Sequence, residues 1–328
     1  MRRTVKRLSL HWYGLNAAAL LLLAVFAYGV AVGTFRLPPY GLLETAAAGL
    51  RDWVAHPLHN ARMQPEKFLQ PLAAVMPEMR APARGAYPGL TFVTGLFGES
   101  LGMRLLDMHG RVVHEWRVSF NDIWPEAPHM DAPRHDWDIQ IHGVHLYPNG
   151  DVVFNFQYGG LVKIDACSRP LWKLAAQTHH SVFEAEDGTL WVPSRRRREE
   201  PLATLPSIPP PFWEELILEV SPDGKVLSET SILDVITRSG FEGLLFATGA
   251  HGPEIAIPFD GDFTHLNEVE VLGTDQAARF PLFAAGDVVV SLRNLNLLLV
   301  LDGADKSIKW WMVGPFLRQH DPDFTDDG

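Results

Sequence analysis

Histidines recur at one position of a sequence repeat in this chain. Three segments each begin with a histidine and end, after seven intervening residues, with a glycine at an expected turn: HGVHLYPNG (142–150), HSVFEAEDG (180–188) and HDPDFTDDG (320–328). A fourth histidine, His265, opens the similar segment THLNEVEVL. Because imidazole titrates near neutral pH, several imidazoles at one place in a structural repeat suggest that they face a shared site.

The residues that accompany these histidines favour an anion as the ligand. Asn267 lies two residues after His265, on the same face of a strand, and Arg293 lies in the segment SLRNLNLLLVLD. An arginine would repel a metal ion, whereas arginine, imidazolium and an amide donor suit an oxyanion such as sulfate or phosphate. We expect no carboxylates to cluster with these histidines. The sequence therefore predicts an anion site rather than a zinc site, with no metal ion.

The sequence contains two further histidines near the predicted site, His142 and His179. His179 lies one residue outside the repeat register, so the repeat selects His180 as the site residue. His142 occupies the repeat position, but the pattern alone assigns it no chemical role. We expect His142 and His179 to line the channel at most.

The elements that must position these residues are short strands. From Gly89 onward, strand-like runs alternate with tight turns in units of about four strands, several ending in a tryptophan strand (Trp116, Trp172 and Trp310). This all-β pattern predicts a β-propeller, with a β-sandwich as the alternative. In a propeller the first strand of each blade lines a central channel, so histidines at the heads of these strands converge.

The repeat also predicts that the propeller is incomplete. The units number four and a fragment, and the last histidine repeat ends at Gly328, the final residue. A closed propeller commonly has about six blades. We expect the propeller domain, residues 89–328, to be truncated at its C-terminus relative to functional relatives.

The N-terminus differs in composition from the rest of the chain. Basic residues in 1–14 precede an uncharged, apolar run over 15–35, and about 20 apolar residues span a bilayer. The flanking charge predicts a single-pass anchor in the inner (cytoplasmic) membrane, with residues 1–14 cytoplasmic and the propeller periplasmic. A cleaved signal peptide ending near Ala31-Val32-Gly33 is the alternative. Residues 36–88 are expected to form a helical connector.

Composition excludes several other functions and partners. With 47% hydrophobic and 20% charged residues, the 328-residue chain is expected to fold, and its net charge of -11 argues against a nucleic-acid partner. The single cysteine, Cys167, excludes an intramolecular disulfide and is expected to be buried. The run Arg195 to Arg198 is expected to lie in a solvated loop.

Four segments resemble the bacterial arylsulfotransferase family, PAPS-independent enzymes on a six-bladed propeller. They are HHSVFEAEDGTLWV, THLNEVEV, SLRNLNLLLVLD and LRQHDPDF, and the resemblance covers roughly residues 90–328. It implies transfer of a sulfuryl group from one phenol to another through a sulfated histidine. By motif, the nucleophile is His320, and the sulfate-binding residues are His180, His265, Asn267 and Arg293.

The resemblance implies an aryl sulfate donor, a phenolic acceptor and no cofactor. A second histidine is expected to protonate the departing phenolate and to accept the proton of the incoming phenol. The anchor, the absence of a cysteine pair and the end of the chain just after His320 depart from the family pattern. The alternatives are a non-catalytic, membrane-anchored propeller that binds an anionic ligand or protein partner, and a metal-dependent hydrolase or lyase.

Overall fold

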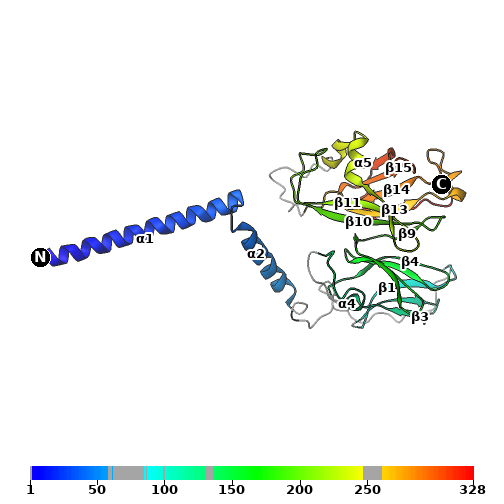
Figure 1. Cartoon of the computed structure of the whole chain (residues 1–328), viewed down its shortest axis with the longest axis horizontal. Coiled ribbons are helices and arrows are strands. Elements are labelled where there is room, and N and C mark those ends of the chain that lie inside the picture. Colours follow the sequence, from blue (N-terminus) through cyan, green and yellow to red (C-terminus); the bar gives the residue numbers. More distant parts are fainter. Residues whose placement is uncertain are drawn as a thin grey trace. The chain divides into compact units, whose positions relative to one another are not determined.

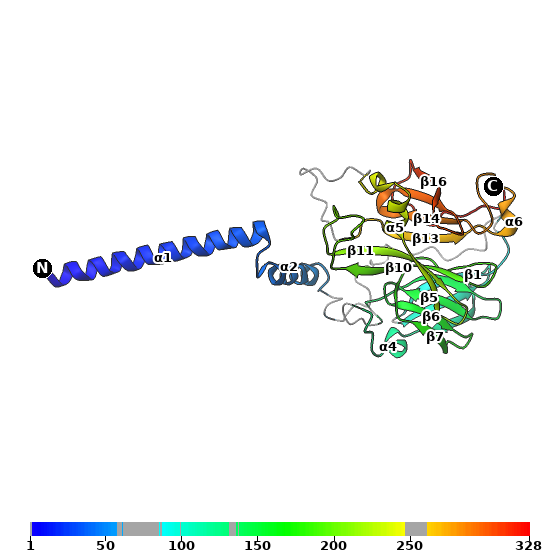
Figure 2. The ribbon, with the colours of Figure 1, turned by 45° about the horizontal axis from the view of Figure 1, so that its top comes forward.

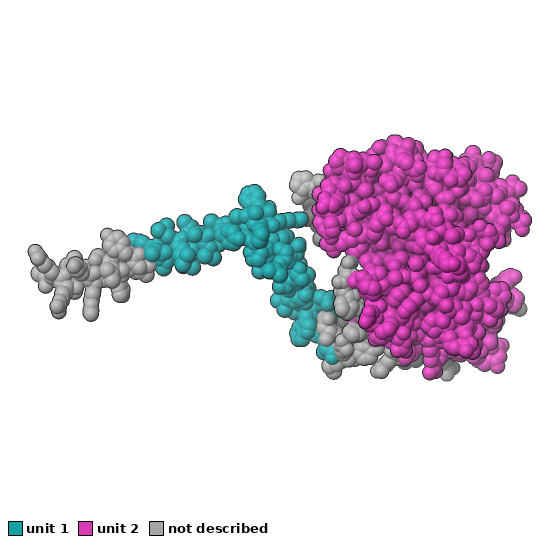
Figure 3. Space-filling view, in the orientation of Figure 1, with its two compact units in different colours: residues 1–71 teal, residues 72–328 magenta. Residues whose placement is uncertain are grey.

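The computed structural model divides the chain into two compact units, residues 1–71 and 72–328 (Figure 3). It describes residues 2–57, 61, 85, 87–98, 100–130, 136, 138–246 and 261–328. Residues 58–60, 62–84 and 86 of the predicted helical connector lie outside the described residues.

The first unit holds two helices, α1 (Arg2–Phe35) and α2 (Tyr40–Ala55). Within α1, Asn16–Phe35 is the one stretch of the described residues long and apolar enough to cross a membrane. Its large apolar side chains, such as Leu22 and Phe26, are exposed to solvent in the structure. The prediction of an apolar N-terminal helix is therefore confirmed, and such a helix serves either as an anchor or as a signal sequence.

The second unit is built from antiparallel sheets, of which the described part contains four (Figures 1 and 2). Each sheet is a meander of strands that follow one another in the chain. The first holds β1 (Thr91–Phe97), β2 (Ser100–Leu106) and β3 (Val112–Arg117); the second β4 (Ile141–Leu146), β5 (Val152–Phe156), β6 (Gly160–Ile164) and β7 (Pro170–Leu174). The third holds β8 (Gln177–Thr178), β9 (Phe183–Glu184), β10 (Leu190–Arg198), β11 (Phe212–Val220) and β12 (Val226–Ser231); the fourth β13 (Leu266–Val271), β14 (Val288–Leu292), β15 (Leu297–Leu301) and β16 (Ile308–Val313).

Short helical segments connect or cover these strands. They are α4 (Phe120–Ile123), α5 (Ile232–Arg238), the 3-10 turn η1 (Glu242–Phe246), α6 (Thr274–Ala277) and the 3-10 turn η2 (Arg293–Leu295). Ser119 and Ser231 cap α4 and α5 by accepting a backbone N–H of the first turn. The predicted meanders of mainly antiparallel strands are thus confirmed.

The glycine of each histidine repeat closes a turn of the same kind. Gly150, Gly188 and Gly328 have φ angles of 86°, 83° and 91°, a region that favours glycine. Each donates its backbone N–H to the carbonyl three residues earlier, at 2.9, 2.9 and 3.2 Å. The turn of the repeat is therefore present in all three segments, whereas the strand expected before it is absent from the third, residues 320–328.

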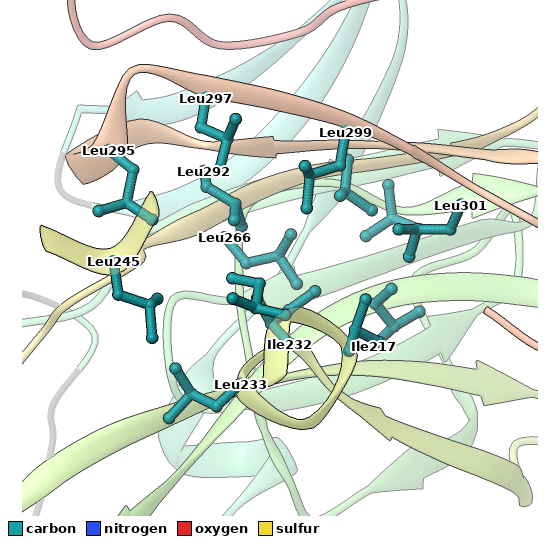
Figure 4. Packing of buried hydrophobic residues seen from close by; sticks show 14 of the residues in the cluster. Ile217, Ile232, Leu233, Leu245, Leu266, Leu292, Leu295, Leu297, Leu299 and Leu301 are labelled. Atoms are coloured by element: carbon teal, nitrogen blue, oxygen red, sulfur yellow. The ribbon is translucent and has the colours of Figure 1, made fainter. Parts of the chain in front are cut away.

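Hydrophobic cores lie between successive sheets. Val152 and Phe154 of the second sheet pack with Met103 and Trp116 of the first. Other residues of the second sheet pack against the third. The third and fourth sheets share the largest cluster, which includes Ile217, Ile232 and a group of leucines on β13 to β15 (Figure 4). Strands of successive sheets also touch directly, β1 with β4 and both β9 and β10 with β13.

One expectation about secondary structure and one about exposure are wrong. Arg195 to Arg198 are the end of strand β10 rather than a loop, because Glu214 on the paired strand β11 holds the guanidinium groups of Arg196 and Arg198 at 2.7 and 2.5 Å. Cys167 is exposed, because it lies in the polar turn between β6 and β7, where its backbone N–H donates to Asp165.

Candidate functional site

The histidines of the repeat lie at the heads of the first strands of three sheets and in the C-terminal segment. His142 is the second residue of β4, and His179 and His180 lie between β8 and β9. His265 directly precedes β13, and His320 follows β16. The structure thus brings together all five histidines that the sequence singled out.

The ring of His180 is the centre of this histidine cluster. Its centroid lies 4.1 Å from that of His142, 5.0 Å from those of His179 and His265, and 5.7 Å from that of His320. His180 has a φ of 53° and His265 a φ of 51°, in the left-handed region that non-glycine residues seldom adopt. Both strained residues lie at the centre of the cluster, which is where proteins tend to keep such conformations for function.

Local irregularities in the first strands aim these residues inward. The pairing register of β4 shifts between Ile141 and Val144, around His142, and that of β13 shifts between Leu266 and Glu268, around Asn267. In the third sheet, residues 179–182 stand opposite only Val192 and Pro193 of β10. Bulges of this kind re-aim side chains next to active sites.

Gly143 and Asn155 hold the β4 bulge against the His180 segment. The Asn155 amide nitrogen donates to the carbonyls of His180 and Ser181, at 3.4 Å each, and its oxygen accepts the backbone N–H of Gly143 at 3.3 Å. A Cβ atom at Gly143 would lie 1.8 Å from the His180 carbonyl oxygen. Only glycine allows the two backbones to approach this closely.

The exposed His320 has one ring nitrogen engaged by the backbone. Its Nδ1 lies 3.1 Å from the carbonyl oxygen of Arg318, an acceptor, so Nδ1 carries the proton and Nε2 the lone pair. Next to it, the side-chain nitrogen of Gln319 donates to Ser291 Oγ at 3.1 Å and to the Leu297 carbonyl at 3.2 Å. These bonds fix the segment that carries His320 against the fourth sheet.

His265 lies between a carboxylate and a guanidinium. Its Nδ1 hydrogen-bonds the Asp262 carboxylate, and its Nε2 lies 3.0 Å from Arg293 Nη1. Arginine only donates, so Nε2 accepts and the proton is on Nδ1, where Asp262 holds it. The backbone N–H of Arg293 also donates to the His265 carbonyl at 3.0 Å.

Burial keeps the central imidazoles neutral. It lowers the pKa of His142 to about 4, and lowers that of His180 further, with the neighbouring histidines adding to both shifts. The His142 Nδ1 accepts the backbone N–H of His180 at 3.2 Å, so neutral His142 carries its proton on Nε2. His142 is therefore a hydrogen-bond donor rather than a cation.

His179 lies behind His180, away from solvent. It is 1% exposed, and its Nδ1 lies 2.8 Å from Nδ1 of His180. Its Nε2 lies 3.0 Å from Oε2 of Glu215, which is also 1% exposed, although the two atoms are not aligned as a hydrogen bond. Burial raises the pKa of Glu215 and lowers that of His179, so both groups are neutral.

A cavity of about 530 Å³ opens beside the cluster. His142, His180, Asn267 and His320 line it, whereas His179, His265 and Arg293 do not. The amide nitrogen of Asn267 donates to the Gln319 carbonyl at 2.7 Å, so Asn267 also holds the His320 segment. The predicted sulfate-binding residues thus divide into a group at the cavity and a pair, His265 and Arg293, behind the His180 ring.

The expectation that carboxylates stay away from the histidines is wrong. Glu268, Glu270, Asp321 and Asp323 line the same cavity. The bulge in β13 explains Glu268, because it breaks the alternation that would place neighbouring residues on opposite faces. Burial raises the pKa of Glu268 to about 9 and of Glu270 to about 7, so Glu268 is uncharged at neutral pH.

The carboxylates at the site were missed by sequence reasoning. Asp262 lies three residues before His265 and Glu268 directly after Asn267, so their proximity to predicted site residues was the available indication. Glu215 had none, because it comes from another strand. Among the described residues, no group of three or more His, Cys, Asp or Glu side chains is arranged to hold a metal ion.

Comparisons with known proteins bear on the part of the chain that holds the site. The model of a family described as arylsulfotransferase (ASST) matches residues 142–328, and no curated protein matches the chain. A solved structure of a protein of unknown function from Bacteroides caccae is 14% identical, with a TM-score of 0.30, over 68% of this chain and 72% of that one. BamB from Moraxella catarrhalis is 12% identical, with a TM-score of 0.35, over 68% of this chain and 46% of the BamB chain.

Proposed function

The chain belongs to the arylsulfotransferase family, and we propose that it transfers a sulfuryl group between phenolic compounds through a sulfohistidine formed on His320. The observation that carries this proposal is the arrangement at the cavity. There the exposed His320, its Nε2 lone pair not engaged by the backbone, lies next to the neutral imidazoles of His142 and His180. No cofactor takes part in the proposed reaction.

In the first half-reaction, Nε2 of His320 attacks the sulfur of the aryl sulfate. The N–S bond forms as the bond between sulfur and the phenolic oxygen breaks. Nδ1–H donates to the Arg318 carbonyl, which stabilises the positive charge that develops on the ring. In the second half-reaction an acceptor phenol gives up its proton to a base at the cavity as its oxygen bonds to the sulfur and the N–S bond breaks, which regenerates neutral His320.

Hydrogen-bond donors and a fixed cation would stabilise the sulfuryl oxygens during transfer. His142 carries its proton on Nε2 and lines the cavity, which suits it to donate to one of these oxygens. The guanidinium of Arg293 would supply positive charge near the His180 ring, because it hydrogen-bonds His265, whose ring contacts that of His180. Removing one such donor commonly costs about 10² to 10³ in rate.

Two further proposals concern the arrangement of the sheets and the N-terminal helix. We propose that the four sheets of the described part are blades of a propeller, because they pack in series rather than as the two layers of a sandwich. A crystal structure with two facing layers would contradict this.

We also propose that α1 anchors the chain in the inner membrane, with the site on the periplasmic side, where aryl sulfates and phenols are its small-molecule partners.

An activity assay on membranes tests the proposal. Membranes from cells that express the full chain are washed at alkaline pH, and release of nitrophenol from nitrophenyl sulfate is measured with and without a phenolic acceptor. We expect acceptor-dependent turnover that stays in the membrane pellet. His320→Asn should lower kcat/KM roughly 10³-fold or more, because the nucleophile is lost.

The exposed His109 supplies the matched control, since His109→Asn changes the same residue type outside the histidine cluster. Its activity should equal that of the wild type. Turnover that survives in His320→Asn would contradict the proposed nucleophile. The absence of turnover with any aryl sulfate, together with ligand binding that His320→Asn leaves intact, would instead favour a non-catalytic module that binds an anion. Activity in the alkaline supernatant would contradict the anchor.

A further inference from the structure

Sulfuryl transfer needs an acidic proton for the leaving group, and the central histidines, as neutral imidazoles, do not supply one. Departure of an unactivated phenolate is slow without a proton donor, since the pKa of such a phenol is about 10. A second histidine is the donor that the family resemblance led us to expect. His142 and His180, however, are neutral at pH 7, because burial lowers the pKa of each. Another group at the cavity must supply the proton.

Glu268 lies on the same cavity as His320 and is 8% exposed. Asp321, the residue that directly follows His320, lies close enough to the Glu268 carboxyl group to raise its pKa. A buried carboxyl group beside a second carboxyl group favours its protonated form. We therefore expect Glu268 to hold an acidic proton at the cavity that His320 also lines.

Glu268 shares its cavity with groups from four parts of the fold. They come from β4 (His142), from the segment between β8 and β9 (His180, Ser181), from β13 itself (Glu270) and from the C-terminal segment (His320, Asp321, Asp323). None of the described residues that line the cavity is a lysine or an arginine. Burial, followed by the effect of Asp321, raises the pKa of Glu268 to about 9. Hydrogen bonds from Ser181 and from the Val269 N–H act in the opposite direction.

We propose that Glu268 is the general acid and base of the transfer. This assignment rests on the proposed function and adds a catalytic residue to it. In the first half-reaction the Glu268 carboxyl group gives its proton to the departing phenolate as the S–O bond breaks, which leaves a phenol, a Glu268 carboxylate and sulfo-His320. In the second, the carboxylate takes the proton of the acceptor phenol as its oxygen bonds to sulfur and the N–S bond breaks. The net charge is the same on both sides of each step.

Two donors with different leaving groups test this role. Nitrophenolate leaves without protonation far more readily than unsubstituted phenolate, so a general acid matters most for phenyl sulfate. Glu268→Gln keeps the size and hydrogen bonds of the side chain but has no dissociable proton. We expect it to lower kcat with phenyl sulfate by about 10² to 10⁴ and with nitrophenyl sulfate by only a few-fold. A merely structural role would lower both rates equally, and that result would overturn the proposal.

The pH profile supplies a second readout. Wild-type Glu268 holds its proton below about pH 9, so the rate with phenyl sulfate should fall as pH rises through that value. In Glu268→Gln, the rate with phenyl sulfate should not show this decline with pH. Glu270→Gln, on the same strand and cavity, and Glu200→Gln, on the exposed surface, are the matched controls. A leaving-group effect in Glu270→Gln but not in Glu268→Gln would overturn the assignment.

A measurement without turnover separates this proposal from the proposed function. Infrared difference spectra of wild type and Glu268→Gln should show the C=O stretch of a protonated carboxyl group at neutral pH in the wild type alone. Absence of that band overturns the role of Glu268, even if sulfo-His320 forms. Presence of the band in a protein that turns over no aryl sulfate locates the failure in the proposed function instead.

Discussion

At the scale of single residues, hydrogen bonds decide which ring nitrogen of each histidine can react. The Arg318 carbonyl leaves Nε2 of His320 as the nucleophilic atom, and the backbone N–H of His180 leaves the proton of His142 on Nε2. Asp262 does the same for His265, since it holds the proton on Nδ1 while Nε2 accepts from Arg293. The cluster therefore contains imidazoles of the same chemistry in different roles.

Asp262→Asn should disturb this arrangement with little change in shape. The asparagine amide can donate to Nδ1 of His265, which moves the ring proton to Nε2 and breaks the bond from Arg293. We expect kcat to fall on the order of 10² or more while KM for the donor changes little. Steady-state kinetics measure both constants, and ¹⁵N NMR of the imidazoles reports the tautomer. Asp122→Asn, on the exposed face of α4, is the control. A kcat within twofold of wild type would argue against a tautomer role for Asp262.

At the scale of elements, the site depends on irregular first strands. Each interruption of pairing, in β4, between β8 and β9, and in β13, carries a histidine or its neighbour. The close approach at Gly143 brings the His142 bulge onto the His180 backbone, so the two rings can lie 4.1 Å apart. A regular strand would point neighbouring residues to opposite faces and separate them.

Gly143→Ala should therefore damage both stability and activity. The new Cβ would meet the His180 carbonyl oxygen at 1.8 Å, a backbone atom that cannot rotate away. We expect the free energy of unfolding to fall by about 2 kcal/mol or more, with loss of turnover because His142 and His180 move apart. Denaturant unfolding and the nitrophenyl sulfate assay measure the two effects.

Gly95→Ala is the matched control, because Gly95 lies in strand β1 with nothing within 4 Å of an added Cβ. It should behave as wild type in both measurements. Equal unfolding curves and equal rates for Gly143→Ala and Gly95→Ala would show that the close approach at Gly143 has no functional consequence.

The strands and turns could be predicted because their determinants are local. The glycine of each repeat marks a turn, and the runs between them mark strands, so the positions of His142, His180 and His265 near strand heads followed from the sequence. The strand expected after His320 is absent, because residues 320–328 form no strand. The carboxylates could not be predicted, since strict alternation places Glu268 opposite Asn267 and only the bulge in β13 brings both to the cavity. Glu215 faces His179 through the packing of β11 beside β10, which no local pattern encodes.

At the scale of the whole molecule, the site exists only because several sheets meet. His142 comes from the second sheet, His180 from the third, and Asn267 and His320 from the fourth sheet and the segment after it. The hydrophobic clusters between the second and third sheets and between the third and fourth hold these strand heads in place. The arylsulfotransferase family model matches this same region, residues 142–328.

Mass spectrometry detects the covalent bond between sulfur and His320 that we propose to form during turnover. The full chain is incubated with nitrophenyl sulfate without acceptor, digested, and searched for a peptide heavier by one SO₃ group. We expect this group on His320, its absence in His320→Asn, and its disappearance when a phenol is added. Release of nitrophenol with no adduct, or an adduct on another residue that a phenol discharges, would contradict this proposal.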